Sequence, residues 1–198
     1  MLNHNKIENI DKYFKKFNYT DLKRYIKFSN SLKKTLNKFD VQFSNKRILD
    51  IGCGPGFAIK SLLKNSNFKE AMGVDSSKVA IQKLKEIFPE AKTMVLNIVE
   101  DDFTYLVDFD VIFCTEVIEH IPDYENVLEK IKNLMNDRTL FILTVPDGRL
   151  DQSMYHVNFF SKISLDVILK KIYTNFHFKL YNFNGSAICA ILKKKWTF

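Results

Sequence analysis

The sequence predicts an α/β fold, with a seven-stranded and mainly parallel sheet that carries helices on both faces. Short apolar runs typical of buried strands alternate with longer amphipathic stretches, which indicates parallel strands joined by helices. A glycine-rich turn joins the first strand to the helix after it, as in sheets that bind ligands at the carboxyl ends of their strands. Near the C-terminus, Asn184-Gly185 lies between two apolar runs and predicts an antiparallel hairpin.

The first 45 residues are predicted to be helical. Apolar residues between Ile7 and about Phe39 recur at mostly helical spacing, which predicts two or three amphipathic helices. We expect residues 1–45 to form an N-terminal helical segment and residues 46–198 to form the sheet, within one structural domain overall. A length of 198 residues, of which 46% are hydrophobic, suffices for one substantial core.

Seven strands and four further helices are predicted after that segment. The strands are expected at residues 46–51, 69–75, 93–96, 109–114, 139–145, 178–182 and 187–192. The helices are expected at residues 57–64, at 76–88, from about 123, and at about 165–173. Ser76 or Ser77 can begin the second of these helices, because a serine hydroxyl accepts a hydrogen bond from a backbone N–H in the first turn.

Charge and cysteine content narrow the function only slightly. The net charge is +7, but the lysines are spread along the chain and only Lys193-Lys194-Lys195 forms a cluster, so a nucleic-acid face is not indicated. The three cysteines lie in predicted strands or in the glycine turn and do not suggest a disulfide framework. The N-terminus lacks the apolar core of a signal peptide, and no apolar run reaches the length of a membrane span. We therefore expect a cytoplasmic protein.

The glycine-rich turn is the strongest functional signal. Gly52, Gly54 and Gly56 follow a buried strand and precede a helix, whose first N–H groups are available to a ligand. A dinucleotide-binding turn needs its third glycine at position 57, which is a phenylalanine here. The spacing is instead G-x-G-x-G preceded by Asp50. A flavodoxin-like loop, or a nucleotide-binding loop for another ligand, is the alternative interpretation.

This motif resembles motif I of the class I S-adenosylmethionine-dependent methyltransferases, which have a Rossmann-like fold. The resemblance implies that S-adenosylmethionine is the cofactor and S-adenosylhomocysteine the product. It implies that Asp50 and the turn face the methionine half, that Asp75 accepts hydrogen bonds from the ribose hydroxyls, and that Asn97 and Ile98 contact the adenine. Asn97 stands where an aspartate is usual.

The same resemblance implies a set of cofactor-binding residues and a role for the N-terminal segment. The implied cofactor-binding residues are Asp50, Gly52, Cys53, Gly54, Gly56, Asp75, Ser76, Asn97, Ile98 and Thr115. Residues 1–45 are implied to form a lid over the cofactor and the methyl acceptor. Simple packing of these helices against the edge of the sheet is the alternative, and both can hold because a lid also buries an apolar face.

A second group of chemically active residues follows the fourth predicted strand. If this segment is helical, Glu116, Glu119 and His120 lie on one face at i, i+3 and i+4, and His156 follows the fifth strand. The set resembles that of small-RNA 2′-O-methyltransferases and of quinone-biosynthesis O-methyltransferases, in which such residues can hold a divalent ion. The implied ligands are Glu116, Glu119, His120 and His156, and magnesium, manganese, iron or zinc would suit them. Without a metal, His120 or His156 is the expected catalytic base.

Three functions are consistent with these residues. The favoured one is O-methylation of a small molecule, such as a metabolite, a quinone precursor or a sugar intermediate. RNA 2′-O-methylation is the second, supported by the E-x-x-E-H set and the basic charge but not by any evident basic and aromatic tract. A binding protein that retains the fold without catalysis is the third. Oligomeric state is not predicted.

Overall fold

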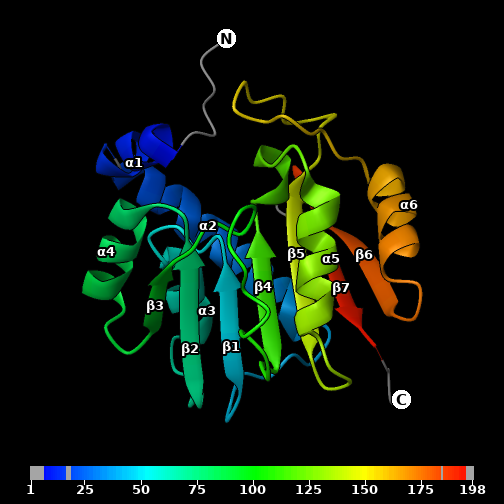
Figure 1. Cartoon of the computed structure of the whole chain (residues 1–198), viewed down its shortest axis with the longest axis horizontal. Helices are drawn as coiled ribbons and strands as arrows, with labels where there is room; N and C mark the ends of the chain where they lie inside the picture. The colour runs from blue at the N-terminus through cyan, green and yellow to red at the C-terminus, as the bar shows by residue number, and fades with distance from the viewer. Residues whose placement is uncertain (1–6, 17–18, 184, 195–198) are drawn as a thin grey trace. The chain divides into compact units, whose positions relative to one another are not determined.

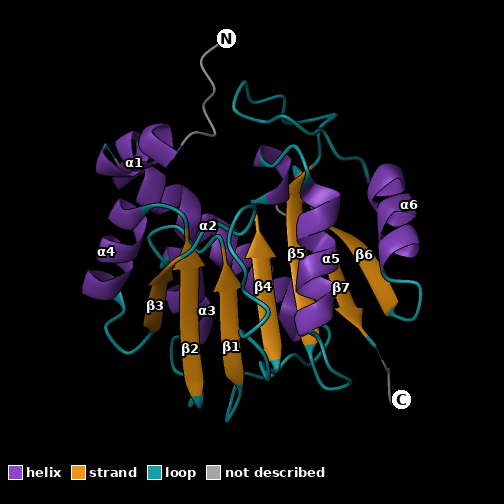
Figure 2. Cartoon of the chain, in the orientation of Figure 1, coloured by secondary structure: helices purple, strands orange, loops and turns teal. Residues whose placement is uncertain are grey.

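The structure is a computed structural model that describes residues 7–16, 19–183 and 185–194 (Figure 1). Its backbone contacts divide the chain into two compact units, Met1–Asn97 and Ile98–Phe198. Each unit combines strands with helices, as Figure 2 shows. None of the described helices is both long enough and apolar enough to cross a lipid bilayer.

In the first unit, residues 7–16 and 19–97 form two N-terminal helices followed by three parallel strands with connecting helices. The elements are α1 (Ile7–Lys15), α2 (Tyr19–Asn37), β1 (Arg47–Ile51), α3 (Phe57–Leu63), β2 (Glu70–Asp75), α4 (Lys78–Ile87) and β3 (Lys92–Val95). The central strand β2 pairs in parallel with β1 on one side and with β3 on the other. This arrangement places the ends of β1 and β2 side by side, with Ile51 opposite Val74.

Within the first unit, helix α4 packs closely on β2 and on the glycine-rich turn because Gly73 and Gly56 leave room for Leu84. A Cβ on Gly73 of β2 would lie 2.5 Å from Leu84 Cδ2, and a Cβ on Gly56 would lie 2.1 Å from Leu84 Cδ1. Ser77 begins the helix, since its hydroxyl accepts a hydrogen bond from Ala80 N at 3.1 Å. The expectation that Ser76 or Ser77 caps this helix is confirmed for Ser77.

The described residues of the second unit form four strands, two α-helices and one short 3₁₀ helix. The elements are β4 (Val111–Thr115), η1 (Ile118–His120), α5 (Tyr124–Leu134), β5 (Leu140–Pro146), α6 (Lys162–Ile172), β6 (His177–Phe183) and β7 (Ala187–Lys193). Strand β5 pairs in parallel with β4, whereas β7 lies between β5 and β6 and is antiparallel to both. Residues Ala187 to Leu192 are all buried, as a near-continuous apolar run in a strand between two others requires.

The predicted fold class is confirmed. The described residues contain seven strands, mostly parallel, with an antiparallel pair at the C-terminal end, and every predicted strand and helix is present within about three residues. The described part of the N-terminal segment forms two helices, within the expected two or three. In the hairpin turn, Gly185 adopts φ 78°, while Asn184 lies outside the described residues.

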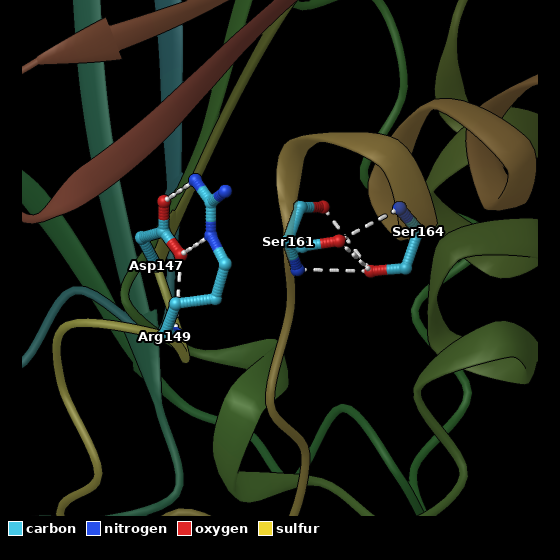
Figure 3. A network of polar contacts seen from close by, with 4 residues as sticks. All are labelled: Asp147, Arg149, Ser161 and Ser164. Carbon is cyan, nitrogen blue, oxygen red and sulfur yellow. Dashed lines mark hydrogen bonds and ion pairs between the residues drawn. The ribbon is translucent and has the colours of Figure 1, made fainter.

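Two local features differ from the expectations. The condition that the segment carrying Glu116, Glu119 and His120 is helical is met only by Ile118–His120, which form a 3₁₀ turn, whereas Glu116 adopts a left-handed φ of 56°. Helix α6 begins at Lys162 rather than near residue 165, because Ser161 and Ser164 form a reciprocal capping box (Figure 3). Ser161 Oγ accepts from Ser164 N at 3.1 Å, and Ser161 N donates to Ser164 Oγ at 2.9 Å.

Replacing Ser161 by alanine is expected to lower the free energy of unfolding by about 1 kcal/mol, because Ser164 N then loses its capping acceptor. Urea unfolding monitored by circular dichroism measures the change. Ser161→Asp keeps a side-chain oxygen at the N-cap and should stay near the wild-type value. Equal stability of the alanine variant and the wild type would show that the cap contributes nothing.

Candidate functional site

The glycine turn of the first unit connects β1 to α3 through three left-handed residues. Gly52, Gly54 and Gly56 have φ values of 70°, 52° and 76°. Side chains other than glycine rarely adopt this conformation, so the turn depends on these residues. Gly56 is further constrained by Leu84, as described above, whereas Gly54 donates its N–H to Asp75 Oδ2 at 2.8 Å.

Asp75 connects the glycine turn to the start of α4. Its Oδ2 accepts from Gly54 N and its Oδ1 accepts from Ser77 N, both at 2.8 Å. Burial raises the pKa of Asp75, and these two hydrogen bonds oppose that rise. A carboxylate oxygen has two lone pairs, so each oxygen retains capacity for one further donor, such as a ribose hydroxyl.

Asp50 is a buried carboxyl group with an unsatisfied oxygen. It is only 2% exposed, and within the described part of the chain no hydrogen-bond donor reaches its Oδ1. Burial, with a smaller contribution from the charge of Asp75, raises the pKa of Asp50 to about 8. A cationic ligand group beside Asp50 would favour its ionised form. The residue therefore has the character of a binding site for a positive charge.

The N-terminal helices contact this turn and the start of α4. Asp11 of α1 accepts hydrogen bonds from Ser77 Oγ and, at 3.3 Å, from Val79 N. A Cβ on Gly54 would lie 3.4 Å from Phe14 Cζ and 3.6 Å from the Tyr25 hydroxyl oxygen. Packing against the predicted cofactor turn is thus observed within the first unit, and a lid function for residues 1–45 stays a prediction.

The remaining predicted cofactor residues have diverse surroundings. The side chain of Cys53 is buried, and its Sγ would lie 2.9 Å from a Cβ on Gly73. Ser76 and Asn97 are half-buried in the first unit, while Ile98 is buried and Thr115 half-buried in the second. Their contacts with a cofactor stay predictions.

In the second unit, Glu119, His120 and His156 bring their ligating atoms together. One potential ligand atom from each residue lies within 4.8 Å of the other two. His120 Nε2 lies 3.7 Å from Glu119 Oε1, and the two imidazole ring centroids are 5.1 Å apart. The fold therefore brings together three of the four predicted metal ligands, with Glu119 and His120 in a 3₁₀ turn and not in an α-helix.

The surroundings of this cluster favour the neutral form of both histidines and the protonated form of Glu119. Burial lowers the pKa of His120, and burial together with His120 lowers the pKa of His156. Burial and the nearby Glu116 raise the pKa of Glu119, whose Oε2 is buried without a hydrogen-bond partner among the described residues. His120 Nδ1 lies 3.0 Å from the Tyr155 carbonyl oxygen, which can only accept. The proton is therefore on Nδ1, and the Nε2 lone pair is available to a proton or a metal.

Glu116 has contacts different from those of the cluster. Its Oε1 accepts a hydrogen bond from Thr144 Oγ1 at 2.8 Å, and its N–H donates to Thr144 O at 3.1 Å. This two-point contact with the buried end of β5 holds Glu116 in its left-handed conformation. Thr144 is a positioning residue that the sequence analysis missed, because only the β4–β5 register brings it beside Glu116.

The loop that carries His156 is fixed by a second missed residue, Asn158. Its Nδ2 donates to Ile118 O at 3.0 Å and to Ile121 O at 2.7 Å, and its N–H donates to Glu119 O at 3.1 Å. At the start of the loop, the buried Asp147 accepts from Arg149 Nε at 2.9 Å and from Nη2 at 2.6 Å (Figure 3). In the sequence, the position of Asn158 two residues after the candidate His156 is the one signal that could have indicated this role.

A family model described as a methyltransferase domain matches residues 14–172. Among curated relatives, ubiquinone biosynthesis O-methyltransferase of Glaesserella parasuis is 33% identical over 112 residues, which cover 50% of this chain and 45% of that protein. Trans-aconitate 2-methyltransferase of Rhodopseudomonas palustris is 23% identical over 128 residues, which cover 63% of this chain and 49% of that protein. The chain thus spans about half the length of these relatives.

Solved structures share the fold over nearly the whole chain. The plantazolicin methyltransferase BpumL in complex with S-adenosylhomocysteine aligns with a TM-score of 0.69 and 16% identity, covering 95% of this chain and 88% of that chain. A protein from Pyrococcus horikoshii OT3 aligns with a TM-score of 0.71 and 18% identity, covering 93% and 99%. At these identities the likeness establishes the fold alone.

Asp50 gives the free protein a characteristic pH dependence. A carboxyl group whose pKa is higher in the folded state stabilises the fold at low pH, and this contribution is lost as the pH rises toward about 8. Between pH ~4 and ~8, ionisation of Asp50 should lower the free energy of unfolding of the wild type by at most about 1.4 kcal/mol per pH unit. This decrease should be absent in Asp50→Asn. The Asn variant should therefore gain stability relative to the wild type as the pH rises through this range.

Urea unfolding of both proteins across this range tests the prediction. The difference between their free energies of unfolding should change with pH. Glu90→Gln, a substitution at an exposed acid, serves as the control and should follow the wild type. A difference between wild type and Asp50→Asn that stays constant with pH would contradict the raised pKa.

Proposed function

The chain belongs to the methyltransferase-domain family, which confirms the resemblance inferred from its glycine motif, and we propose that it transfers the methyl group of S-adenosylmethionine to a hydroxyl of a small molecule. The observation that carries the proposal is the buried, unsatisfied carboxyl of Asp50 beside a turn of left-handed glycines. The names of its curated relatives, which include O-methyltransferases and a methyltransferase for a carboxylic acid, support a small-molecule acceptor.

The residues of the first unit fit the cofactor. S-adenosylmethionine carries an α-ammonium group, which would satisfy the charge and the free oxygen of Asp50. Its ribose hydroxyls would donate hydrogen bonds to the remaining lone pairs of Asp75, whose carboxylate is already held in place by the N–H groups of Gly54 and Ser77. When bound, the cofactor supplies a methyl group made electrophilic by the neighbouring sulfonium.

The residues of the second unit supply proton transfer. A hydroxyl attacks the methyl group more readily as it loses its proton, so a neutral imidazole beside it serves as the base. His120 fits this role, since the Tyr155 carbonyl fixes the proton on Nδ1 and leaves Nε2 as the acceptor. Burial keeps His120 neutral. Asn158 and Thr144 hold the surrounding loop and Glu116 in position.

A divalent ion at Glu119, His120 and His156 is a second candidate, which the convergence of three ligand atoms favours. Two neutral imidazoles and one carboxylate form a ligand set common to divalent transition metals. The ion would compensate the unsatisfied Oε2 of Glu119 and would lower the pKa of a bound hydroxyl. Glu116 lies outside this group of three, so we do not assign it as a ligand.

RNA 2′-O-methylation is the less favoured acceptor class, since the two curated relatives described above are named for ubiquinone biosynthesis and for trans-aconitate, and neither name refers to RNA. Methyl transfer from labelled S-adenosylmethionine to catechols and hydroxy acids, compared with transfer to short RNA, separates the two. Cofactor binding with no transfer to any acceptor would instead favour a non-catalytic binding protein.

Cofactor binding should become tighter as the pH rises from 6 to 8, because the ammonium group selects the ionised form of Asp50. Each unit below the pKa of about 8 should weaken the affinity for S-adenosylhomocysteine by up to about tenfold. Calorimetry of this ligand in buffers of different ionisation enthalpy should also show proton release. Asp50→Asn should bind weakly at every pH. Failure of the wild type to bind at pH 8 would refute the proposed function.

The metal hypothesis predicts specific losses of Co²⁺ binding, which is followed by the visible absorption of the ion. Glu119→Gln and His156→Ala should each weaken binding by about tenfold or more, because each removes one of three ligands. His177→Ala, on the exposed start of β6, serves as the control and should bind like the wild type. Unchanged methyl transfer in the presence of a chelator would refute a catalytic metal. His120 would then act as the base without one.

A further inference from the structure

Lys130 of α5 holds the loop that follows β3. Its Nζ lies 3.0 Å from Val99 O, 3.4 Å from Ile98 O and 3.4 Å from Asp101 O. An ammonium group has three N–H donors and no acceptor, so three carbonyl oxygens use its full donor capacity. One side chain of α5 thus satisfies three backbone carbonyls within four consecutive residues, all in the second unit.

The loop also encloses the ammonium group from a further direction. The Phe103 ring centroid lies 5.5 Å from Lys130 Nζ, and this ring is only 2% exposed. The positive charge lowers the pKa of Asp102 as a minor contribution beside the hydrogen bonds from Thr104. Residues 98–103 therefore fold around one cation, whose removal would leave the three carbonyls without their charged donor.

These contacts fix the orientation of successive peptide groups. A peptide unit is planar, and its C=O and N–H point in opposite directions. With the carbonyls of Ile98 and Val99 directed at Lys130, the N–H groups of Val99 and Glu100 are directed away from it. The ammonium group thereby determines which polar atoms the loop presents on its other side.

We infer that Lys130 is a positioning residue for recognition of the purine base of the cofactor. The inference rests on the proposed function and on the family resemblance, which implies that Asn97 and Ile98 at the start of this loop contact the adenine. A purine is distinguished by the pattern of donors and acceptors along its edge, so backbone atoms can read it only where the peptide planes are held. Lys130 supplies that constraint from outside the binding residues.

The test compares two ligands that differ only in the base. S-adenosyl-L-homocysteine has a 6-amino donor and an N1 acceptor, whereas S-inosyl-L-homocysteine has a 6-oxo acceptor and an N1–H donor. Calorimetry of both ligands with Lys130→Met should show about fivefold to tenfold weaker binding of the adenosyl ligand and a smaller preference for it over the inosyl ligand. Methionine keeps an apolar side chain over Phe103 while removing the charge.

Lys132→Met is the matched control, because Lys132 lies on the same helix but donates to Ile172 O at 2.9 Å. It should leave both affinities and their ratio unchanged. Equal affinities for wild type and Lys130→Met, or an equal loss for both ligands in a variant of lower melting temperature, would overturn the inference and assign Lys130 to stability alone. Absence of binding by the wild type would refute the proposed function and the inference together.

Discussion

The two hydrogen bonds accepted by Asp75 organise the candidate cofactor region of the first unit. One carboxylate receives the N–H of Gly54 from the turn after β1 and the N–H of Ser77 from the start of α4. Gly54 lies 21 residues before Asp75 in the sequence and Ser77 lies 2 residues after it. Asp75 thereby holds both loops at the end of β2. Because Asp11 of α1 also binds Ser77, the N-terminal helix belongs to the same network.

Each unit retains one buried carboxyl oxygen without a protein donor among the described residues, on Asp50 in the first and on Glu119 in the second. An unsatisfied buried acceptor reduces stability, and folded proteins seldom keep one without a functional reason. Both groups respond by favouring the protonated form, as their raised pKa values indicate. A bound cation, either an organic ammonium group or a metal ion, would contact the free oxygen of either group and stabilise its ionised form.

The sequence was sufficient for the strands and for the glycine turn, because both depend on local properties. An apolar run such as Ala187 to Leu192 is buried wherever the sheet forms, and Gly52 to Gly56 can follow a path closed to other residues. The candidate site in the second unit was only partly predictable. Glu119 and His120 are neighbours in sequence, but the contact between Thr144 and Glu116 spans 28 residues and depends on the register of β4 and β5. Ser161 and Ser164 resemble an ordinary polar loop until their reciprocal bonds are seen.

The close approach of Leu84 to two glycines has an evolutionary consequence. Gly56 and Gly73 come from different segments, yet a side chain at either would occupy the space of the same leucine. Substitutions at these three positions are therefore not independent, because an added methyl group at Gly73 requires Leu84 to move or become smaller and Cys53, whose Sγ would lie 2.9 Å away, to move as well. Among homologues, such a dependence should appear as covariation between position 73 of β2 and position 84 of α4. In the evolution of one lineage, the change of Leu84 to a smaller side chain would precede the loss of Gly73.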